Sequence, residues 1–347
     1  MLAGSSQSRL PNEARIVTTI ALMGDVMLGR LVNESVIQDS TKPIETVWGD
    51  LPPWLRRADL RLINLECVIS TRGEKWRPET KAFHFRANPR AIEVLRAVRI
   101  DGVSLANNHV LDYGPAALAE CLARLDAAGI QRTGAGHHLG EALTPMLFRV
   151  PHGPVAVVGL TDNEPEWEAS DRTPGVHFVH YGLHGLVEPS RSRVAAVLQA
   201  LKARARVIIV SAHVGPNWGG PGRAMRRLAH ECLDLGADLY WGHSNHTPQG
   251  IELYEGKVVL YSTGDFIDDY AVDPSERNDL SFLFLVEMDQ AGVAGLRLIP
   301  TAIDDCRVRV AQGEERAFLE RTMQVKCAAL GTTIRFQEGK GYVPLRA

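Results

Sequence analysis

The segment RIVTTIALMGD at residues 15–25 decides how the rest of the chain is interpreted. From Arg15 to Met23 it is mostly apolar and β-branched, which is typical of a strand buried inside a sheet. The run ends at Gly24-Asp25, where a glycine lets the backbone turn sharply and a carboxylate follows at once. We therefore expect a central strand that delivers an acidic side chain at its carboxyl end.

Further strand-like runs follow this segment, and several of them alternate with helical patterns. The expected strands cover residues 60–64, 103–106, 155–160, 207–211, 238–241 and 258–262. The expected helices cover residues 89–98, 115–128, 191–203 and 222–235. From residue 251 the pattern becomes hairpin-like, with Glu255-Gly256 as a turn, strands at 280–288 and 295–300, and a last helix at 314–330. This succession predicts an α/β fold.

The bulk composition is that of an ordinary globular protein. Of the 347 residues, 45% are hydrophobic and 23% are charged. The net charge of -3 and the pI of about 6.5 give no reason to expect nucleic acid as a partner. A polar arm at residues 1–15 precedes the first strand, and residues 16–347 contain no repeat or long linker. We therefore expect a single domain after a polar arm.

Cysteine usage and hydropathy indicate the compartment. The five cysteines contain no CxxC pair, which argues against a disulfide framework and against a thiolate zinc site. The N-terminal arm lacks the apolar run of a signal peptide. No stretch approaches the roughly 18 apolar residues that span a bilayer. The sequence therefore predicts a cytoplasmic protein without membrane contacts.

Polar residues gather where the expected strands end. The set consists of Asp25, Asn64, Glu66, Asn108, His213, His243 and His246. Each of them alone is more often an ordinary turn or cap residue, so the prediction depends on their recurrence at successive strand ends. In open α/β sheets, ligands bind at the carboxyl ends of the strands, and we expect these side chains to share one site at one sheet edge. Carboxylate, amide and imidazole together suit one or two divalent ions of the Mn, Fe, Zn or Co class, because calcium prefers more oxygen ligands.

Six segments resemble a known family in both sequence and order. They are ALMGDVMLGR (21–30), INLECVIS (63–70), FRANPRAIEVLRAVRIDGVSLANNHVLDYG (85–114), SAHVG (211–215), GHSNHTPQG (242–250) and LYSTGDFIDDY (260–270). The chain resembles the CapA family of poly-γ-glutamate capsule biosynthesis proteins, a branch of the calcineurin-like metallophosphatase superfamily. The resemblance covers about residues 16–289. It implies a double-sheet β core flanked by helices, with a one- or two-metal site at the strand ends.

The resemblance also implies roles for single residues. The metal ligands that it implies are Asp25, Glu66, Asn108, His213, His243 and His246. His109 takes the place of the catalytic histidine of the superfamily, beside the metal ions. The sequence departs from the phosphoesterase pattern where Met27 replaces a histidine, where Glu66 stands for a bridging aspartate, and where the acid of the third motif is displaced to Asp112. One metal position is therefore poorer in ligands, and phosphate-ester hydrolysis is less expected.

Three functions remain open at this point. We expect no membrane anchor of the kind found in typical capsule proteins, and the chain is similar in kind to the soluble CapA-like peptide epimerase of lasso-peptide biosynthesis. The first expectation is therefore a metal-dependent epimerase that inverts a Cα from L to D in a ribosomal precursor peptide. It would need no organic cofactor, since no GxGxxG follows a strand, and its partners would be the peptide, its leader and a leader-recognition protein. The alternatives are a hydrolase or transferase acting on poly-γ-glutamate or related amide polymers, and a non-catalytic metal-binding scaffold.

Several other side chains are candidates for catalysis or substrate binding. The candidates for proton transfer are His109, Asp112, Cys67 and Asp265. A thiol near cations serves in acid–base chemistry, but a lone buried cysteine is also an ordinary small hydrophobe. An aspartate such as Asp265 also serves to orient a ligand histidine. The candidates for substrate binding are Arg30 and Arg86, which suit a carboxylate, together with Asn64 and Trp218, the latter on a Gly/Pro-rich loop.

Overall fold

Strand β1 (Thr18–Val26) lies within a ten-stranded mixed sheet, which we call the larger sheet. The computed structural model describes residues 17–77 and 79–345, so the expected arm at residues 1–15 lies outside the described residues. The order along the sheet is β21-β22-β19-β18-β1-β2-β5-β6, while β17 also pairs with β1 and β20 with β19. These strands are β2 (Leu60–Leu65), β5 (Gly102–Ser104), β6 (Gln131–Thr133), β17 (Asp265–Ile267), β18 (Leu280–Asp289), β19 (Gly292–Asp304), β20 (Arg307–Val310), β21 (Arg335–Gln337) and β22 (Lys340–Pro344).

A second, six-stranded sheet, the smaller sheet, has the order β15-β16-β14-β13-β9-β8. Its strands are β8 (Met146–Val150), β9 (Gly153–Thr161), β13 (Val207–His213), β14 (Leu239–His243), β15 (Ile251–Tyr254) and β16 (Lys257–Leu260). The predicted turn at Glu255-Gly256 joins β15 to β16, and both turn residues have positive φ, at 49° and 77°. That backbone conformation is the one that two-residue hairpin turns require.

The two sheets face each other across an apolar core. Along β1, the side chains of Ile20 and Leu22 belong to the cluster between the sheets, whereas Ala21 and Met23 belong to the cluster under the outer helices. In the smaller sheet, Ile209 is likewise on the inner face. This alternation follows from the two-residue period of a strand buried on both faces. The predicted α/β class with a double-sheet core is confirmed.

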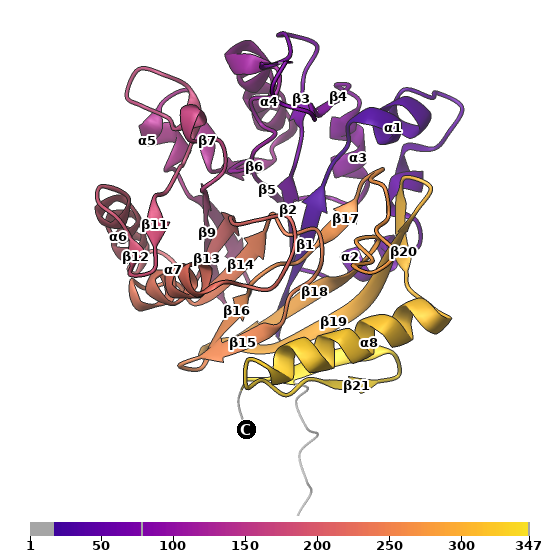
Figure 1. Ribbon diagram of the computed structural model, residues 1–347, viewed down its shortest axis with the longest axis vertical. Helices are drawn as coiled ribbons and strands as arrows, with labels where there is room; N and C mark the ends of the chain where they lie inside the picture. The colour runs from indigo at the N-terminus through magenta and orange to yellow at the C-terminus, as the bar shows by residue number, and fades with distance from the viewer. Residues whose placement is uncertain (1–16, 78, 346–347) are drawn as a thin grey trace, which may run out of the picture.

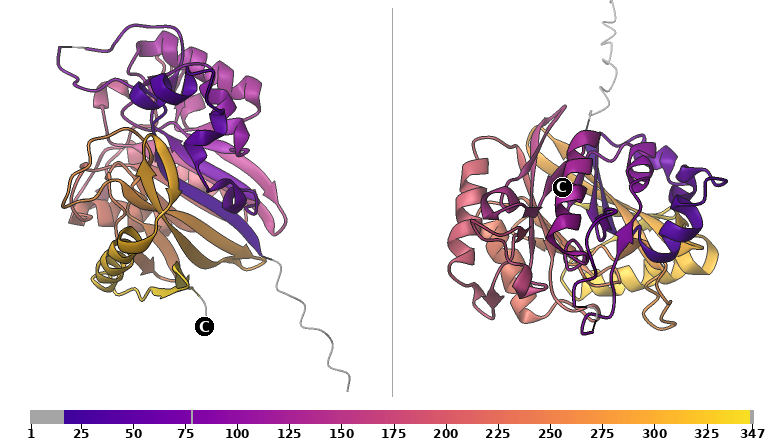
Figure 2. Two further views of the ribbon diagram at one scale, coloured as in Figure 1. Left: turned by 90° about the vertical axis from the view of Figure 1, so that its right-hand side faces the viewer. Right: turned by 90° about the horizontal axis from the view of Figure 1, so that it is seen from above.

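Helices cover the outer faces of both sheets (Figures 1 and 2). On the larger sheet lie α1 (Arg30–Val32), α2 (Pro52–Leu55), α3 (Ala91–Ala97) and α4 (Gly114–Ala128), and on the smaller sheet lie α6 (Ser190–Leu201) and α7 (Arg223–Asp234). Helix α8 (Gly313–Ala328) instead packs Leu319 and Met323 into the core between the sheets, at the lower right in Figure 1. Within the described ranges, no helix is long and apolar enough to cross a bilayer.

Short elements complete the fold. They are η1 (Asn33–Ile37), η2 (Ile44–Trp48), β3 (Val68–Ile69), β4 (Arg86–Ala87), β7 (Ala135–Gly136), α5 (Leu139–Ala142), η3 (Pro165–Trp167), β10 (Gly175–Val176), β11 (Tyr181–Gly182) and β12 (Gly185–Leu186). Strands β3 and β4 pair with each other, and two residues separate the carboxyl end of β2 from the start of β3. They therefore lie close to the strand ends that carry the polar residues.

Two expectations about the strand ends were wrong. Strand β1 continues through Gly24-Asp25 to Val26, because Asp25 pairs with Asp265 of β17 on one side and with Asn64 of β2 on the other. Gly24 makes no sharp turn there; a Cβ at this position would lie 1.9 Å from the carbonyl oxygen of Gly264, so the glycine permits close backbone approach. The polar strand ends also belong to two facing sheets rather than to one sheet edge.

The segment 261–264 connects the two sheets directly. It leaves β16 in the smaller sheet and enters β17 in the larger sheet. Its last residue, Gly264, accepts a hydrogen bond from the backbone N–H of Asp25 at 3.0 Å. The carboxyl ends of the two sheets are therefore joined by covalent structure as well as by packing.

Candidate metal centre and active site

The carboxyl ends of four strands meet between the two sheets. Asp25 is the penultimate residue of β1, and Glu66 directly follows β2. His213 and His243 are the last residues of β13 and β14, and they are paired neighbours in the smaller sheet. All four side chains are buried, with at most 2% of their surface exposed. The strand ends predicted to carry ligands therefore converge on one buried point.

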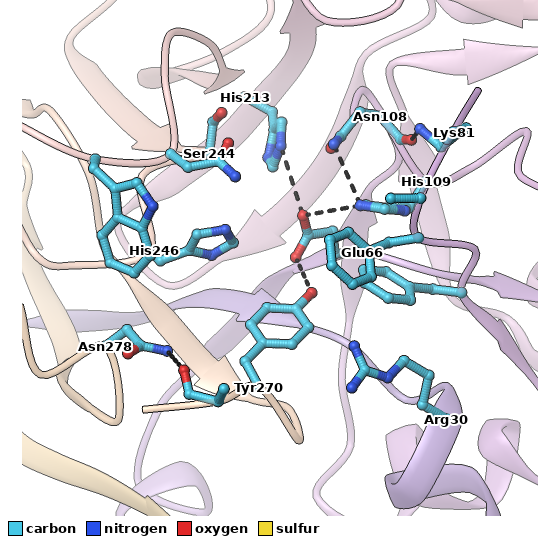
Figure 3. A pocket seen from close by; sticks show the side chains of 16 residues that line it. Arg30, Glu66, Lys81, Asn108, His109, His213, Ser244, His246, Tyr270 and Asn278 are labelled. Carbon is cyan, nitrogen blue, oxygen red and sulfur yellow. Dashed lines mark hydrogen bonds and ion pairs between the residues drawn. The ribbon is translucent and has the colours of Figure 1, made fainter. Parts of the chain in front are cut away.

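Asp25, Glu66 and His213 form a compact cluster of possible ligands. One ligand atom from each lies within 4.8 Å of the others. His213 Nδ1 is 3.8 Å from Asp25 Oδ1, and His213 Nε2 is 3.8 Å from Glu66 Oε1. Figure 3 shows Glu66 between His213 and His109. This triad has the donor chemistry of a divalent metal site.

His243 approaches the same oxygen of Asp25 as His213 does. Its Nδ1 is 3.5 Å from Asp25 Oδ1, and its Nε2 is 3.0 Å from the hydroxyl of Ser211. When Nε2 donates its proton to Ser211, the lone pair of Nδ1 faces the carboxylate of Asp25, as a ligand histidine requires. Asn64 donates to the same Asp25 Oδ1 at 2.8 Å and thereby fixes the carboxylate. Asn64 is fully buried and is not among the residues that line the pocket; its side chain contacts Asp25 and His213 and accepts from Asn107 Nδ2 at 3.1 Å.

His246 approaches from the loop after β14. Ser244 has a φ of 79°, a left-handed conformation that is uncommon for a residue with a side chain. His246 Nδ1 lies 2.9 Å from Asp265 Oδ1, which orients the ring. The ring of Trp218 lies 5.4 Å from that of His246, centroid to centroid. Asp265 thus lies where it could orient a histidine, which is one of the two roles considered for it, and both roles stay predictions.

The loop after β5 carries Asn108, His109 and Asp112. His109 Nδ1 is 2.6 Å from Asp112 Oδ2, and the ring of His109 stacks on Phe85 with centroids 3.9 Å apart. Lys81 donates to the backbone oxygen of Asn108 at 2.7 Å and holds the loop in place (Figure 3). His109 Nε2 lies 3.9 Å from Glu66 Oε1. The histidine therefore reaches the cluster with its Nε2 side.

Burial dominates the electrostatics of these groups. It raises the pKa of Asp25 to about 7 and raises the pKa of Glu66 and that of Asp265 well above the usual range, with the neighbouring carboxylates adding to the effect on Glu66 and Asp265. Burial also lowers the pKa of His243 to about 3 and lowers the pKa of His213 well below its usual value. Closely spaced buried carboxyls and neutral imidazoles form an environment that a divalent cation would stabilise.

Unpaired atoms indicate how well the site fits a metal ion. In the described part of the chain, the buried atoms Asp25 Oδ2 and Asn108 Oδ1 have no hydrogen-bond partner. An unsatisfied buried oxygen is costly unless a ligand occupies it. Both atoms belong to residues for which the sequence predicted a metal role. The residues present therefore fit a divalent ion, and its identity and the number of ions stay predictions.

A pocket of about 430 Å³ opens onto this cluster. Five of the candidate residues line it: Glu66, Asn108, His109, His213 and His246. Three further candidates are buried and do not line it: Asp25, His243 and Asp265. Arg30 and Trp218 also line the pocket, as the sequence analysis expected. Lys81, Phe85, Ser244, Tyr270 and Asn278 line it as well and were not among the candidates.

Two candidates lie apart from this arrangement. Cys67 is fully buried in the core under the outer helices, and burial raises the pKa of its thiol far above the usual value. Arg86 lines a neighbouring cavity instead. Of the pocket residues that the sequence analysis missed, Tyr270 could have been found, because it ends the LYSTGDFIDDY motif. In the structure its hydroxyl donates to Glu66 Oε2 at 3.3 Å.

The chain is similar to curated proteins whose names refer to polyglutamine synthesis and to PGA biosynthesis. It is 34% identical over 351 residues to the "probable polyglutamine synthesis accessory protein" of Mycobacterium tuberculosis strain CDC 1551, covering 89% of this chain and 90% of that protein. It is 26% identical over 273 residues to the "PGA biosynthesis protein CapA" of Bacillus subtilis strain 168, covering 78% of this chain and 68% of that protein. Among solved structures, a phosphatase of Mycoplasma pneumoniae is similar to it at a TM-score of 0.46 and 12% sequence identity, over 85% of this chain and 92% of that chain.

The family model agrees with the motifs found in the sequence. The model described as bacterial capsule synthesis protein PGA_cap matches residues 19–270, a range that contains all of the candidate site residues. This range also contains the six segments that carry the CapA resemblance, which is thereby confirmed. The chain belongs to the bacterial capsule synthesis protein family PGA_cap.

Proposed function

We propose that the protein is a metal-dependent hydrolase or transferase that acts on the amide bonds of poly-γ-glutamate or a related glutamyl polymer. The observation that carries the proposal is that the Asp25–Glu66–His213 cluster lies beside the His109–Asp112 pair. Glu66, His109 and His213 of these two groups line one pocket. The names of the relatives, which refer to polyglutamine and PGA synthesis, support a glutamyl polymer as the substrate.

The metal would be held by the six predicted ligands, namely Asp25, Glu66, Asn108, His213, His243 and His246. A divalent ion bound there supplies Lewis acidity toward an amide carbonyl. The buried setting of the ligands supports this role, because charge interactions strengthen where water is excluded.

In this proposal His109 would move the proton of the reaction. Its Nδ1–H donates to Asp112 Oδ2, so that Nε2 carries the lone pair on the pocket side. Nε2 would take a proton from the attacking water or amine and return it to the departing amine, while the C–N bond of the amide breaks and a new C–O or C–N bond forms. Attack by water gives hydrolysis, and attack by an amine gives transfer.

Peptide epimerisation, the first expectation from the sequence, has weaker support than this alternative. Neither the mycobacterial relative nor the Bacillus relative has a name that refers to a precursor peptide. Inverting a Cα also needs proton-transfer groups on both faces of the carbon. Lys81 and Tyr270 are potential donors in the pocket, but Lys81 already donates to Asn108 O and Glu164, and Tyr270 donates to Glu66.

One experiment separates these reactions. Metal-loaded protein is incubated with oligo-γ-glutamate in heavy water enriched in heavy oxygen, and products are measured by mass spectrometry with chiral analysis. The proposal expects shorter chains with solvent oxygen in the new carboxyl group, or a new amide when an amine acceptor is added, and no activity from His109→Gln. Carbon-bound deuterium at unchanged chain length would replace the proposal with epimerisation.

A further inference from the structure

A second cavity of about 480 Å³ adjoins the metal pocket and shares Arg30 with it. Its lining is polar and includes three cationic side chains, Arg30, Lys75 and Arg86. Glu34 is the one acidic side chain among its lining residues in the described chain. The protein as a whole has a net charge of -3, so the gathering of positive charge here is local.

Arg30 is held in a strained conformation at the junction of the two cavities. Its φ is 47°, in the left-handed region that residues with side chains seldom adopt. Asp269 accepts from the backbone N–H of Leu31 at 2.8 Å and forms an ion pair with Arg30 Nε at 3.3 Å. The guanidinium lies 5.9 Å from the ring centroid of Tyr270, beside it in Figure 3. Strain of this kind concentrates at ligand-binding positions.

Arg86 has free capacity to bind an anion. Its guanidinium stacks 4.0 Å from the ring centroid of Tyr113, which fixes its plane. Its hydrogen bonds, to the backbone oxygens of Arg72 and Gly73, are long, at 3.4 and 3.5 Å. Within residues 17–77 and 79–345, neither Arg86 nor Lys75 forms an ion pair with a carboxylate. A stacked, unpaired guanidinium is suited to bidentate binding of a carboxylate.

The two guanidinium groups come from segments in direct contact. A Cβ on Gly29, the residue before Arg30, would lie 3.1 Å from the backbone nitrogen of Arg86. The backbone N–H of Asn88, the residue after β4, also donates to Asn33 Oδ1 at 2.7 Å, which fixes the end of β4 against η1. The spacing of the two arginines is therefore set by the fold rather than by flexible loops. The metal pocket and the second cavity therefore meet at Arg30.

We propose that this second cavity is a subsite for carboxylates of a polyanionic chain whose neighbouring unit occupies the metal pocket. The identity of that chain as a glutamyl polymer rests on the proposed function. In a γ-linked glutamyl chain each repeat carries a free α-carboxylate, so successive repeats present successive charges. Arg30 faces the repeat at the junction, and Arg86 and Lys75 face the next repeats.

The test measures binding of a short synthetic oligo-γ-glutamate and of its α-carboxamide analogue, which has the same backbone without the charges. Titration calorimetry on metal-loaded protein is carried out with wild type, Arg86→Gln, Lys75→Gln and the matched control Arg57→Gln. Arg57 is an exposed arginine that also lies over a ring, 5.9 Å from Trp54. We expect Arg86→Gln to weaken binding of the charged oligomer about tenfold and Lys75→Gln several-fold.

Three features of the result are specific to the subsite. Binding of the carboxamide analogue should be weak and equal in all four proteins. Added salt should reduce the difference in affinity for the charged oligomer between wild type and Arg86→Gln. Arg57→Gln should bind as wild type does. Equal affinity of wild type and Arg86→Gln for the charged oligomer, with both proteins folded and metal-loaded, overturns the proposal.

The outcome also separates the subsite from the proposed reaction. Arg86-dependent binding without any cleavage or transfer would leave the subsite standing and remove the proposed function. Cleavage of the oligomer with the same KM in wild type and Arg86→Gln would leave the function standing and remove the subsite.

Discussion

His109 Nδ1 lies 2.6 Å from Oδ2 of the buried Asp112, and this contact determines which imidazole nitrogen faces the pocket. Replacing Asp112 by asparagine lets the carboxamide N–H donate to Nδ1, which moves the ring proton to Nε2. We expect Asp112→Asn to lower kcat by roughly 10²–10⁴-fold, as in catalytic pairs of this kind.

Steady-state turnover of oligo-γ-glutamate, with metal content measured on the same samples, checks this expectation. Asp126→Asn is the control, since Asp126 is exposed and pairs with Arg132 on the surface. Turnover of Asp112→Asn within about threefold of wild type, well short of the loss expected of a positioned acid–base pair, would assign the proton transfer to another group.

Metal content should depend on the residues of the buried cluster. We expect His213→Ala and Glu66→Gln to lose most of the bound divalent ion and nearly all activity, because each removes one member of the triad. Chelation should lower the Tm of the wild type, since a ligand that binds only the folded state stabilises it. Elemental analysis and thermal unfolding with and without chelator measure both effects.

The exposed His184 provides the control for the metal experiment. His184→Ala should keep the metal, the activity and the chelator-dependent shift in Tm. Full metal content in both cluster variants would place the ion elsewhere.

We expect Cys67 to contribute to the stability of the fold and not to catalysis. Its side chain is fully buried in an apolar cluster, away from the pocket. We expect Cys67→Ala to lower the free energy of unfolding by about 1 kcal/mol through the small cavity it leaves, with kcat unchanged. Denaturant unfolding and turnover measure the two quantities separately, and a loss of turnover without a loss of stability would make Cys67 an acid–base candidate again.

His177 should make the protein sensitive to acid. Burial lowers the pKa of His177 from 6.5 to about 4, while its Nδ1 donates to the backbone oxygen of Gly159 at 2.8 Å. The unfolded chain therefore binds more protons than the folded chain between these two values. The part of the free energy of unfolding that is linked to neutral His177 is fully present above pH 6.5. It falls as the pH drops toward 4, by up to about 3 kcal/mol.

The variant His177→Asn keeps a donor for Gly159 but has no group that titrates in this range. We expect its free energy of unfolding to vary less with pH between 6.5 and 4 than that of wild type. His184→Asn, at an exposed position, should follow the wild-type curve. Parallel curves for wild type and His177→Asn would contradict the prediction.

Much of the fold could be predicted from local patterns. The apolar runs around Ile20 and Ile209 indicated buried strands, and helix α4 occupies nearly the range that its pattern predicted. The division of the strands between two sheets could not be predicted in this way, because strands buried on both faces look alike in sequence. The continuation of β1 past Gly24 depends on its pairing with β17, which lies far along the chain.

The site was predictable where residues follow strands and unpredictable where distant loops supply them. Asp25, His213 and His243 stand at strand ends, and their positions followed from the strand assignments. Tyr270 reaches Glu66 from 204 positions away, and Lys81 reaches the Asn108 loop from a segment without regular structure. Arg30 and Arg86 looked equivalent in sequence, but only Arg30 lines the metal pocket.

The passage of segment 261–264 from one sheet to the other has a consequence for the order of events during folding. Asp265 reaches His246 only after this segment has placed β17 beside β1, and Asp25 meets His213 only after the two sheets have packed together. Metal uptake should then be among the last steps of refolding, later than the recovery of secondary structure. A chain cut within this segment would yield two fragments that bind the ion only when they reassemble, so that metal retention reports assembly of the whole core.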